Sequence, residues 1–390
     1  MEGHVKTKFF ILADTHCYGP DKFKVPDIPV DVAIHCGDLT EGSKLAEFHT
    51  ALDILREINA PLKLVIAGNH DFTLDTQAFS RKLQSGLGAF KDPEEVIETV
   101  YGTPGEARYL IDSHKDDGIV FLDEGTHVFT LENGANLTVY ASPFTPSRDM
   151  DKGFTYKRRD GHKFNIPDYG VDIVMTHGPP RNILDTDYMH TPAGCSGLYQ
   201  AVAKVRPRMH CFGHIHEAWG AKLVSWRKYG FPIFNGWVMD GQATVEIDTL
   251  STALPGFKDC ELEVQIKAVR LLELREAGYI ETSHSKIAGD AHPVEPGRNT
   301  LFVNAAVTPY GRKQNQLPWV VEIDLPVSKE ACRTEATTKA GTGGNSEGSM
   351  EEIPVAVVKM DLDCLPSSAA MNELNKLNDR LARMSIKSAA

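Results

Sequence analysis

The sequence lacks any long apolar run. No stretch approaches the roughly 20 consecutive apolar residues that a membrane-spanning helix needs. The segment at residues 1–14, MEGHVKTKFFILAD, contains only the run FFILA, which is too short for the apolar part of a signal peptide. These absences predict a soluble chain that neither enters a membrane nor carries an export signal.

Paired cysteines are also missing. The chain has 7 Cys, an odd number, and no two of them stand in a CxxC spacing. This pattern argues against a disulfide framework and against a zinc site built from thiolates. A reducing compartment fits such a sequence, and we expect the protein in the cytoplasm.

Positive charge is scarce. The chain has 41 Lys and Arg against 53 Asp and Glu, a net charge of -12. A nucleic-acid-binding surface needs clustered Lys and Arg, so the balance argues against one. The oligomeric state is left open by composition. As partner we expect neither nucleic acid nor a membrane.

What the sequence does contain is a set of short apolar runs that each end in polar residues. Most of them begin with β-branched or aromatic residues, which is typical of strands buried on both faces. Helical patterns lie between some runs, at residues 43–58 and 195–205. The alternation predicts an α/β fold with parallel or mixed strands. The five runs are at residues 8–16, 31–40, 63–71, 171–180 and 208–216.

Further segments predict a large sheet content, enough for two stacked sheets. They are residues 119–122, 127–132, 137–142, 243–248 and 300–307. Residues 262–277 have the pattern of an amphipathic helix. The composition changes near residue 325, and a stretch rich in Thr, Gly, Ser and Ala follows. We predict one domain over residues 1–326 and a low-complexity, mostly disordered tail over residues 327–390.

Residues able to bind metal ions follow all five runs, where ligands of α/β sheets bind. They are Asp14, His16, Asp38, Asn69, His70, Asp71, His177, His214 and His216. Oxygen and nitrogen donors without a thiolate suit divalent ions such as Mn, Fe or Zn in a site that is not structural zinc. The donors outnumber what one ion needs. The set therefore predicts two ions ~3.5–4 Å apart that share a carboxylate.

The spacing within these motifs has a physical interpretation. Residues two apart on an extended strand point the same way, so Asp14 and His16 are expected to bind one ion together. Each of Gly37, Gly68 and Gly213 precedes a ligand-type residue, where a glycine lets the backbone turn and leaves room for an ion.

Taken singly, each motif has a structural explanation. GNHD at residues 68–71 is consistent with a turn, and Asp38 with a helix N-cap. An isolated histidine is more often structural than a ligand, and we interpret the remaining ones in that way. They are His4, His35, His49, His114, His127, His162, His190, His210, His284 and His292. Five strand ends with such residues in one chain argue against coincidence.

The order of these motifs resembles that of the calcineurin-like metallophosphoesterase superfamily. The motifs are DTH, GD, GNHD, THGPP and GHIH. A narrower set resembles the metallophosphoesterase-domain-containing subfamily, with its brain-type members and fungal relatives. That set is YASPFTPS, THGPPRNILD, GCSGL, FGHIHEAWG and FVNAA. The resemblance covers about residues 8–325.

The resemblance implies a four-layer α/β/β/α sandwich of two mixed β-sheets flanked by helices. It also implies a ligand set. One ion would be held by Asp14, His16 and His216, and the other by Asn69, His177 and His214. Asp38 would bridge the two ions.

The resemblance further implies the chemistry, in which a hydroxide activated by two metal ions attacks phosphorus. His70 stands at the position that family members place beside the substrate phosphate. Glu41 stands where related phosphatases keep an acid that orients this histidine, and Asp71 is its rival. His216, lost in some brain-type relatives of low activity, is present here and favours a working enzyme.

The chain departs from its relatives in two places. Most of residues 218–298 is predicted to be an insertion near the rim of the site. The run GDLTEGS lacks the Arg that protein phosphatases carry after their GDxxD motif, which counts against a phosphoprotein phosphatase.

We expect a phosphodiesterase whose substrate is a small-molecule phosphoester or nucleotide. The alternatives are a phosphomonoesterase, a nucleotide-binding protein with weak residual activity, and a nuclease, which the acidic charge disfavours.

Overall fold

The computed structural model describes residues 3–17, 23–86, 93–228, 238–254, 256, 258–308 and 316–328. From residue 329 onward, the tail predicted over residues 327–390 lies outside the described residues. Among the helices of the described ranges, none combines the length and the apolar character needed to cross a bilayer.

Six strands form the first sheet, in the order β13-β15-β1-β2-β3-β4. The four strands from β1 to β4 pair in parallel, while β15 runs antiparallel to β1, so the sheet is mixed. The strands are β1 (His4–Leu12), β2 (Val32–His35), β3 (Leu62–Val65), β4 (Ile119–Phe121), β13 (Ile280–Ser283) and β15 (Trp319–Pro326).

Seven strands form the second sheet, in the order β12-β11-β14-β10-β9-β6-β5. Its central strands are parallel and its outer pairings antiparallel. The strands are β5 (Gly125–Thr130), β6 (Asn136–Ser142), β9 (Ile173–Thr176), β10 (Met209–Phe212), β11 (Gly220–Trp226), β12 (Met239–Thr249) and β14 (Asn299–Asn304). A separate small sheet pairs β7 (Thr145–Ser147) with β8 (Thr155–Lys157).

Helices occur between the strands. The α-helices are α1 (Leu45–Glu57), α2 (Thr76–Gly86), α3 (Pro93–Tyr101), α4 (Glu106–Asp112), α5 (Ser196–Val205), α6 (Leu250–Ala253) and α7 (Glu261–Ala277). The short 3-10 turns are η1 (Phe72–Leu74), η2 (Lys115–Asp117) and η3 (His216–Ala218).

The side chains of β1 show how the layers stack. Because successive residues of a strand face opposite ways, Phe9 and Ile11 join one core and Phe10 joins another. The first core lies between the two sheets and includes Val139 of β6. The second core covers the other face of the first sheet and includes Phe48 of α1.

A third core covers the outer face of the second sheet. There Val174 of β9 and Phe212 of β10 pack with Leu198 and Val202 of α5. Helix, sheet, sheet and helix therefore follow one another, which confirms the predicted α/β/β/α sandwich.

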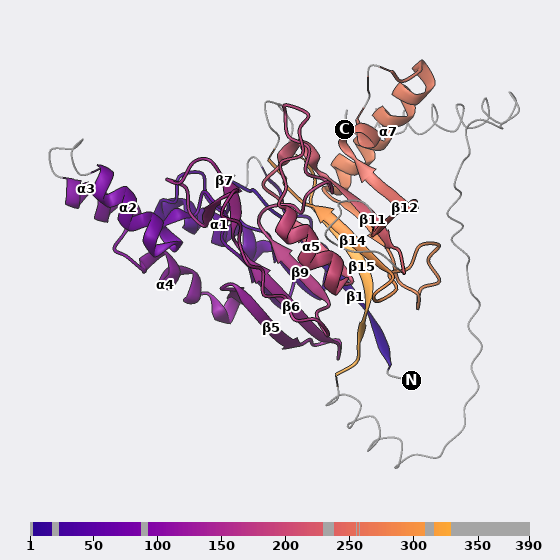
Figure 1. The fold of residues 1–390 in the computed structure, drawn as a ribbon, viewed down its shortest axis with the longest axis horizontal. Coiled ribbons are helices and arrows are strands. Elements are labelled where there is room, and N and C mark those ends of the chain that lie inside the picture. Colours follow the sequence, from indigo (N-terminus) through magenta and orange to yellow (C-terminus); the bar gives the residue numbers. More distant parts are fainter. Residues whose placement is uncertain are drawn as a thin grey trace, which may run out of the picture.

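The predicted helix at residues 262–277 forms as α7, but its amphipathic character is weak. Val269 is the only residue of this helix that is buried, and Ile266 and Leu272 are 37% and 43% exposed. The apolar residues of α7 are spread around its circumference, so no single apolar face forms. In Figure 1, α7 stands at one end of the molecule, beyond β11 and β12.

Five strands were not predicted, namely β7, β8, β11, β13 and β15. Two of them lie within residues 218–298, where β11 pairs with β14 and β13 pairs with β15. That this segment is an insertion stays a prediction.

Candidate active site

The ligand-type residues gather where strands of both sheets end. We call this region the ligand edge; it comprises residues 13–16, 36–41, 66–71, 177–178 and 213–216. Hydrogen bonds join the two sheets here. The N–H of Ala13 donates to the carbonyl oxygen of Ala305 at 2.9 Å, and the His177 ring Nδ1 lies 2.9 Å from the carbonyl oxygen of Cys36.

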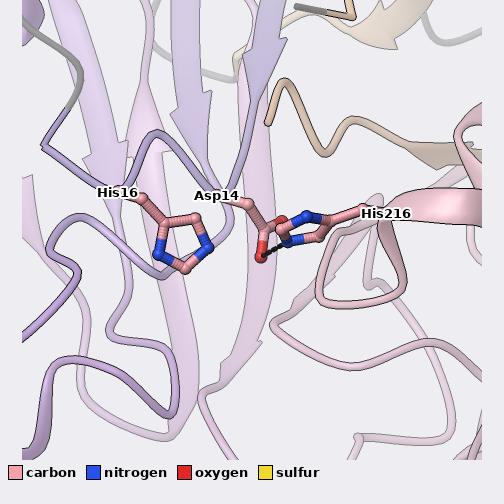
Figure 2. Close-up of side chains that lie close together, drawn as sticks. All are labelled: Asp14, His16 and His216. Carbon is pink, nitrogen blue, oxygen red and sulfur yellow. Dashed lines mark hydrogen bonds and ion pairs between the residues drawn. The ribbon is translucent and has the colours of Figure 1, made fainter. Parts of the chain in front are cut away.

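Asp14, His16 and His216 form the first group able to hold an ion. The Asp14 carboxylate is fully buried and lies 3.3 Å from Nε2 of His216 (Figure 2). It also accepts the backbone N–H of His214 at 2.9 Å. Burial would raise the pKa of Asp14, but the charge and hydrogen bond of His216 outweigh it and hold the pKa below its usual range.

Asp38, His177 and His214 form the second group. Nε2 of His177 lies 3.4 Å from the Asp38 carboxylate and 3.0 Å from Oδ1 of Asn69. Since a carbonyl oxygen only accepts, Nδ1–H of His177 donates to Cys36. That bond leaves Nε2 as the nitrogen that faces the other ligand-type residues.

Asp38 belongs to more than one group. It also lies 3.8 Å from Nε2 of His16, and His16, Asp38 and His70 form a third cluster of close donor atoms. Asp38 thus stands between the two predicted ligand sets. By distance alone, His70 is also a candidate ligand.

The buried carboxylates make the ligand edge attractive to cations. Burial lowers the pKa of His16 and of His177. Glu41 and Asp38 raise the pKa of His16, and Asp38 raises the pKa of His177, by more than burial lowers them. The result in both cases is a pKa of about 9. His214 differs, because burial and the charge of His177 lower its pKa to about 3, so it is the neutral imidazole that a metal needs.

The prediction that Asp14 and His16 align on an extended strand is wrong. β1 ends at Leu12, and both residues have left-handed backbone angles, with φ of 56° and 44°. Asp38 and His214 adopt the same region, with φ of 54° and 69°. Side chains therefore converge through strained turns beyond the strand and not through strand periodicity.

Two glycines are required by close approach. A Cβ on Gly68 would overlap the Asp38 carboxylate and lie 2.7 Å from the His177 ring. A Cβ on Gly213 would overlap the Asp14 carboxylate. These contacts require glycine beside the ligand residues, whereas the expectation that the glycines leave room for an ion stays a prediction.

His70 lies beside His16, with ring centroids 4.8 Å apart. Its Nδ1 lies 2.6 Å from the backbone carbonyl oxygen of Glu41 and 3.8 Å from the Glu41 carboxylate. That carboxylate instead approaches Nδ1 of His16 at 3.0 Å. Glu41 therefore orients His70 through its main chain.

The Asp71 carboxylate is fully buried and joins neighbouring turns. It accepts the backbone N–H groups of Leu39, Thr40 and Gly68 and the hydroxyl of Thr40, at 2.7 to 3.1 Å. Burial and the nearby Asp38 raise its pKa to about 6. These contacts connect the turn after β2 with the turn after β3.

One residue near the site was not predicted. Nζ of Lys152, in the loop between β7 and β8, lies 3.2 Å from Nε2 of His70. The residues around it, DMDKGFT, carry no motif that indicates a role. Only the fold brings this lysine to the ligand edge.

A cavity of about 870 Å³ is lined by residues that follow His216 in the sequence, and by none of the predicted ligand residues themselves. Glu217 and Ala218 line it, as does Gln316, whose side-chain amide donates to the His216 carbonyl oxygen at 2.8 Å. Residues 249–251 of β12 and α6 also line it. The volume lies within the range of roughly 300–1,000 Å³ common to small-molecule sites.

The residues present fit divalent metal ions. Two buried carboxylates, of Asp14 and Asp38, face histidine nitrogens in clusters whose donor atoms lie within 4.8 Å of one another. Oxygen and imidazole donors without a thiolate suit Mn, Fe or Zn.

The family model of calcineurin-like phosphoesterases matches residues 7–218. The chain belongs to this family. The match spans the strands that carry the ligand edge, from β1 to β10, and ends at η3. Members of the family are hydrolases of phosphoester bonds that depend on divalent metals.

Curated relatives agree with the family match. The chain is 32% identical over 222 residues to human metallophosphoesterase domain-containing protein 1, covering 55% of this chain and 62% of that protein. A UPF0046 protein of Caenorhabditis elegans is 30% identical over 229 residues, covering 57% of this chain and 54% of the relative. These relatives support the predicted subfamily.

A third relative is far longer. A probable rhamnogalacturonate lyase C of Emericella nidulans is 28% identical over 263 residues, covering 61% of this chain and 22% of that protein. The chain therefore spans between about a fifth and two thirds of the curated relatives it matches. Among solved structures, a purple acid phosphatase from yellow lupin seeds aligns with a TM-score of 0.32 and 9% identity, covering 80% of this chain and 48% of that one.

Proposed function

We propose that the chain is a phosphodiesterase that acts on small molecules such as nucleotides and uses two divalent metal ions. The observation that carries the proposal is the position of Asp38 between two groups of ligand atoms. A carboxylate shared in this way is what a pair of neighbouring ions requires. We propose Asp14, His16 and His216 for one ion, Asn69, His177 and His214 for the other, and Asp38 as the bridge.

The cavity beside His216 supports a small-molecule substrate. A phosphodiester carries a second organic group, which needs space next to the metal ions. The cavity, whose wall begins one residue after His216, has a volume of about 870 Å³, and part of its wall comes from the segment predicted to be an insertion, residues 218–298. We propose that this segment shapes the substrate site within the domain predicted over residues 1–326.

Two ions, when bound, would supply a hydroxide for in-line attack on phosphorus and would neutralise charge on the phosphoryl oxygens. The protein contributes the rest. Asp14 and Asp38 hold their charge in a buried edge, which favours cations over water. His70, with Nδ1–H donated to the Glu41 carbonyl oxygen, keeps Nε2 directed at the substrate side, where a proton on it would be given to the leaving oxygen.

The experiment is hydrolysis of bis-p-nitrophenyl phosphate and p-nitrophenyl phosphate by metal-stripped protein with Mn added back. We expect metal-dependent turnover that favours the diester. Asp38→Ala should abolish it, because both ligand groups lose a member. Asp53→Ala, which removes an exposed carboxylate of α1, is the matched control and should behave as the natural sequence does.

Other outcomes would change the proposal. Preferred turnover of p-nitrophenyl phosphate would replace the diesterase by a phosphomonoesterase. No turnover of either ester with Mn, Fe or Zn would contradict catalysis altogether. Binding of a nucleotide without turnover would then favour a binding protein.

A further inference from the structure

We propose that Lys152 binds the phosphate of the substrate together with His70. This inference rests on the proposed function and adds a residue that neither the motifs nor the relatives assign. It starts from the contact between the Lys152 ammonium and the His70 ring, where Nζ lies 3.2 Å from Nε2 and 3.4 Å from Nδ1.

The backbone fixes the position of Lys152. The N–H of Gly153 donates to the carbonyl oxygen of Asn69 at 2.9 Å, and the N–H of Phe154 donates to the Asp75 carboxylate at 2.8 Å. A Cβ on Gly153 would lie 2.7 Å from Cα of Phe72, so only glycine allows this approach. The loop is thus seated on the segment that carries Asn69 and His70.

The hydrogen bond between His70 and Glu41 fixes which ring nitrogen of His70 carries a hydrogen. The Glu41 carbonyl oxygen, 2.6 Å from Nδ1, can only accept, so Nδ1 carries a hydrogen. Nζ of Lys152 lies 3.2 Å from Nε2 and 3.4 Å from Nδ1, so the ammonium lies against the His70 ring and not in line with one nitrogen. His70 in turn forms a cluster with His16 and Asp38, so the contact with the His70 ring brings Lys152 to the ligand edge.

Lys152 has no carboxylate partner among the described residues, since none of their carboxylate oxygens lies within 4.0 Å of its Nζ. The nearest acid of this cluster, Glu41, directs its carboxylate to His16. Glu41 acts on Lys152 only through its charge, from beyond 4.0 Å, so an ammonium next to residues that fit metal ions is suited to an anion that bridges the two. A phosphate oxygen beside His70 would accept a charge-assisted hydrogen bond from Lys152.

The test compares Lys152→Gln and Lys152→Arg with Lys157→Gln, an exposed lysine of β8 on the same segment. The anchoring bonds of the loop come from the backbone of Gly153 and Phe154, so the variants should fold, which thermal unfolding would check. We would measure hydrolysis of bis-p-nitrophenyl phosphate by the Mn-loaded full chain, and binding of inorganic phosphate by calorimetry.

For Lys152→Gln we expect kcat/KM to fall about 10- to 100-fold and phosphate to bind more weakly by a similar factor, as for loss of one hydrogen bond to a charged group. Lys152→Arg should keep part of both, and Lys157→Gln should stay within about twofold. Natural phosphate affinity and natural kcat/KM in folded Lys152→Gln would overturn the proposal. Because phosphate binding needs no turnover, an inactive natural protein would contradict the proposed function while the calorimetry still tested Lys152.

Discussion

The ligand edge and helix α7 differ in how strongly contacts constrain their residues. At the ligand edge, Asp14, Asp38 and His177 are buried, and Gly68 and Gly213 have no space for a Cβ. In α7, the 17 residues Glu261–Ala277 include one buried side chain, Val269.

The difference has a physical cause. Buried charged groups need partners at defined positions, whereas an exposed helical residue keeps its water and touches little. We therefore expect small changes at the ligand edge to cost stability and metal binding together. Comparable changes in α7 should cost little of either.

Removal of metal should have the largest effect of all these changes. The effect should be confined to the ligand edge and should not reach α7. An ion bound to the folded protein at 100 to 1,000 times its Kd adds about 3–4 kcal/mol of stability. We expect chelation by EDTA to lower the free energy of unfolding by that order and to increase amide hydrogen exchange at residues 13–16, 36–41 and 66–71. An equal increase of hydrogen exchange in α7 would contradict the expected difference between α7 and the ligand edge.

Gly68→Ala should destabilise the ligand edge nearly as much. The new Cβ would overlap the Asp38 carboxylate and force the turn to move, at a cost of about 3 kcal/mol, and metal content after dialysis should drop. Gly241→Ala in β12 is the matched control, since its Cβ meets no atom within 4 Å. Denaturant unfolding of both variants gives the difference, and similar losses for the two would show that the close approach at Gly68 is unimportant.

Acid should weaken the sheet beneath the ligand edge. His210 of β10 is fully buried, and its Nε2 lies 2.9 Å from the Thr176 hydroxyl, which donates to Gly178. Burial lowers the pKa of His210 to about 3, against about 6.5 in an unfolded chain. The unfolded chain therefore binds the proton first as pH falls below about 6.5. Stability present above that pH is lost toward pH 3, by up to about 1.4 kcal/mol per pH unit.

His210→Gln checks this effect through the slope of unfolding free energy between pH 6.5 and 4.5. The variant should lose stability less steeply than the natural sequence, by about 1 kcal/mol per pH unit. His49→Gln, on the exposed side of α1, should keep the natural slope. An unchanged slope in His210→Gln would mean that this ring does not contribute to the acid sensitivity.

Within α7 the comparison can be sharpened by two truncations of apolar side chains. Leu272→Ala, at a position 43% exposed, should change the free energy of unfolding by about 0.5 kcal/mol or less. Val269→Ala, at a buried position, should cost about 1–2 kcal/mol. Urea unfolding measures both, and a larger loss for Leu272→Ala than for Val269→Ala would contradict the exposed position of Leu272.

The sequence predicted the elements that have strong local signals. Runs such as residues 63–71 became β3 and the turn after it, and residues 195–205 became α5. The sequence signals failed for segments that form strands only because a distant strand pairs with them. β15 holds the place beside β1 through eight paired residues, from His4 with Pro326 to Ile11 with Trp319, that are more than 300 positions apart.

The sequence alone determined the fold class and the candidate ligands, because buried strands and metal-binding side chains depend on which residue type stands at each position. Only the tertiary structure decided how they meet. The left-handed turns at Asp14 and Asp38, the Glu41 main chain against His70, and the approach of Lys152 are set by packing between distant segments. Such contacts produce no periodic pattern in a sequence, since each depends on the course of the backbone at one place and not on a repeat of residue types.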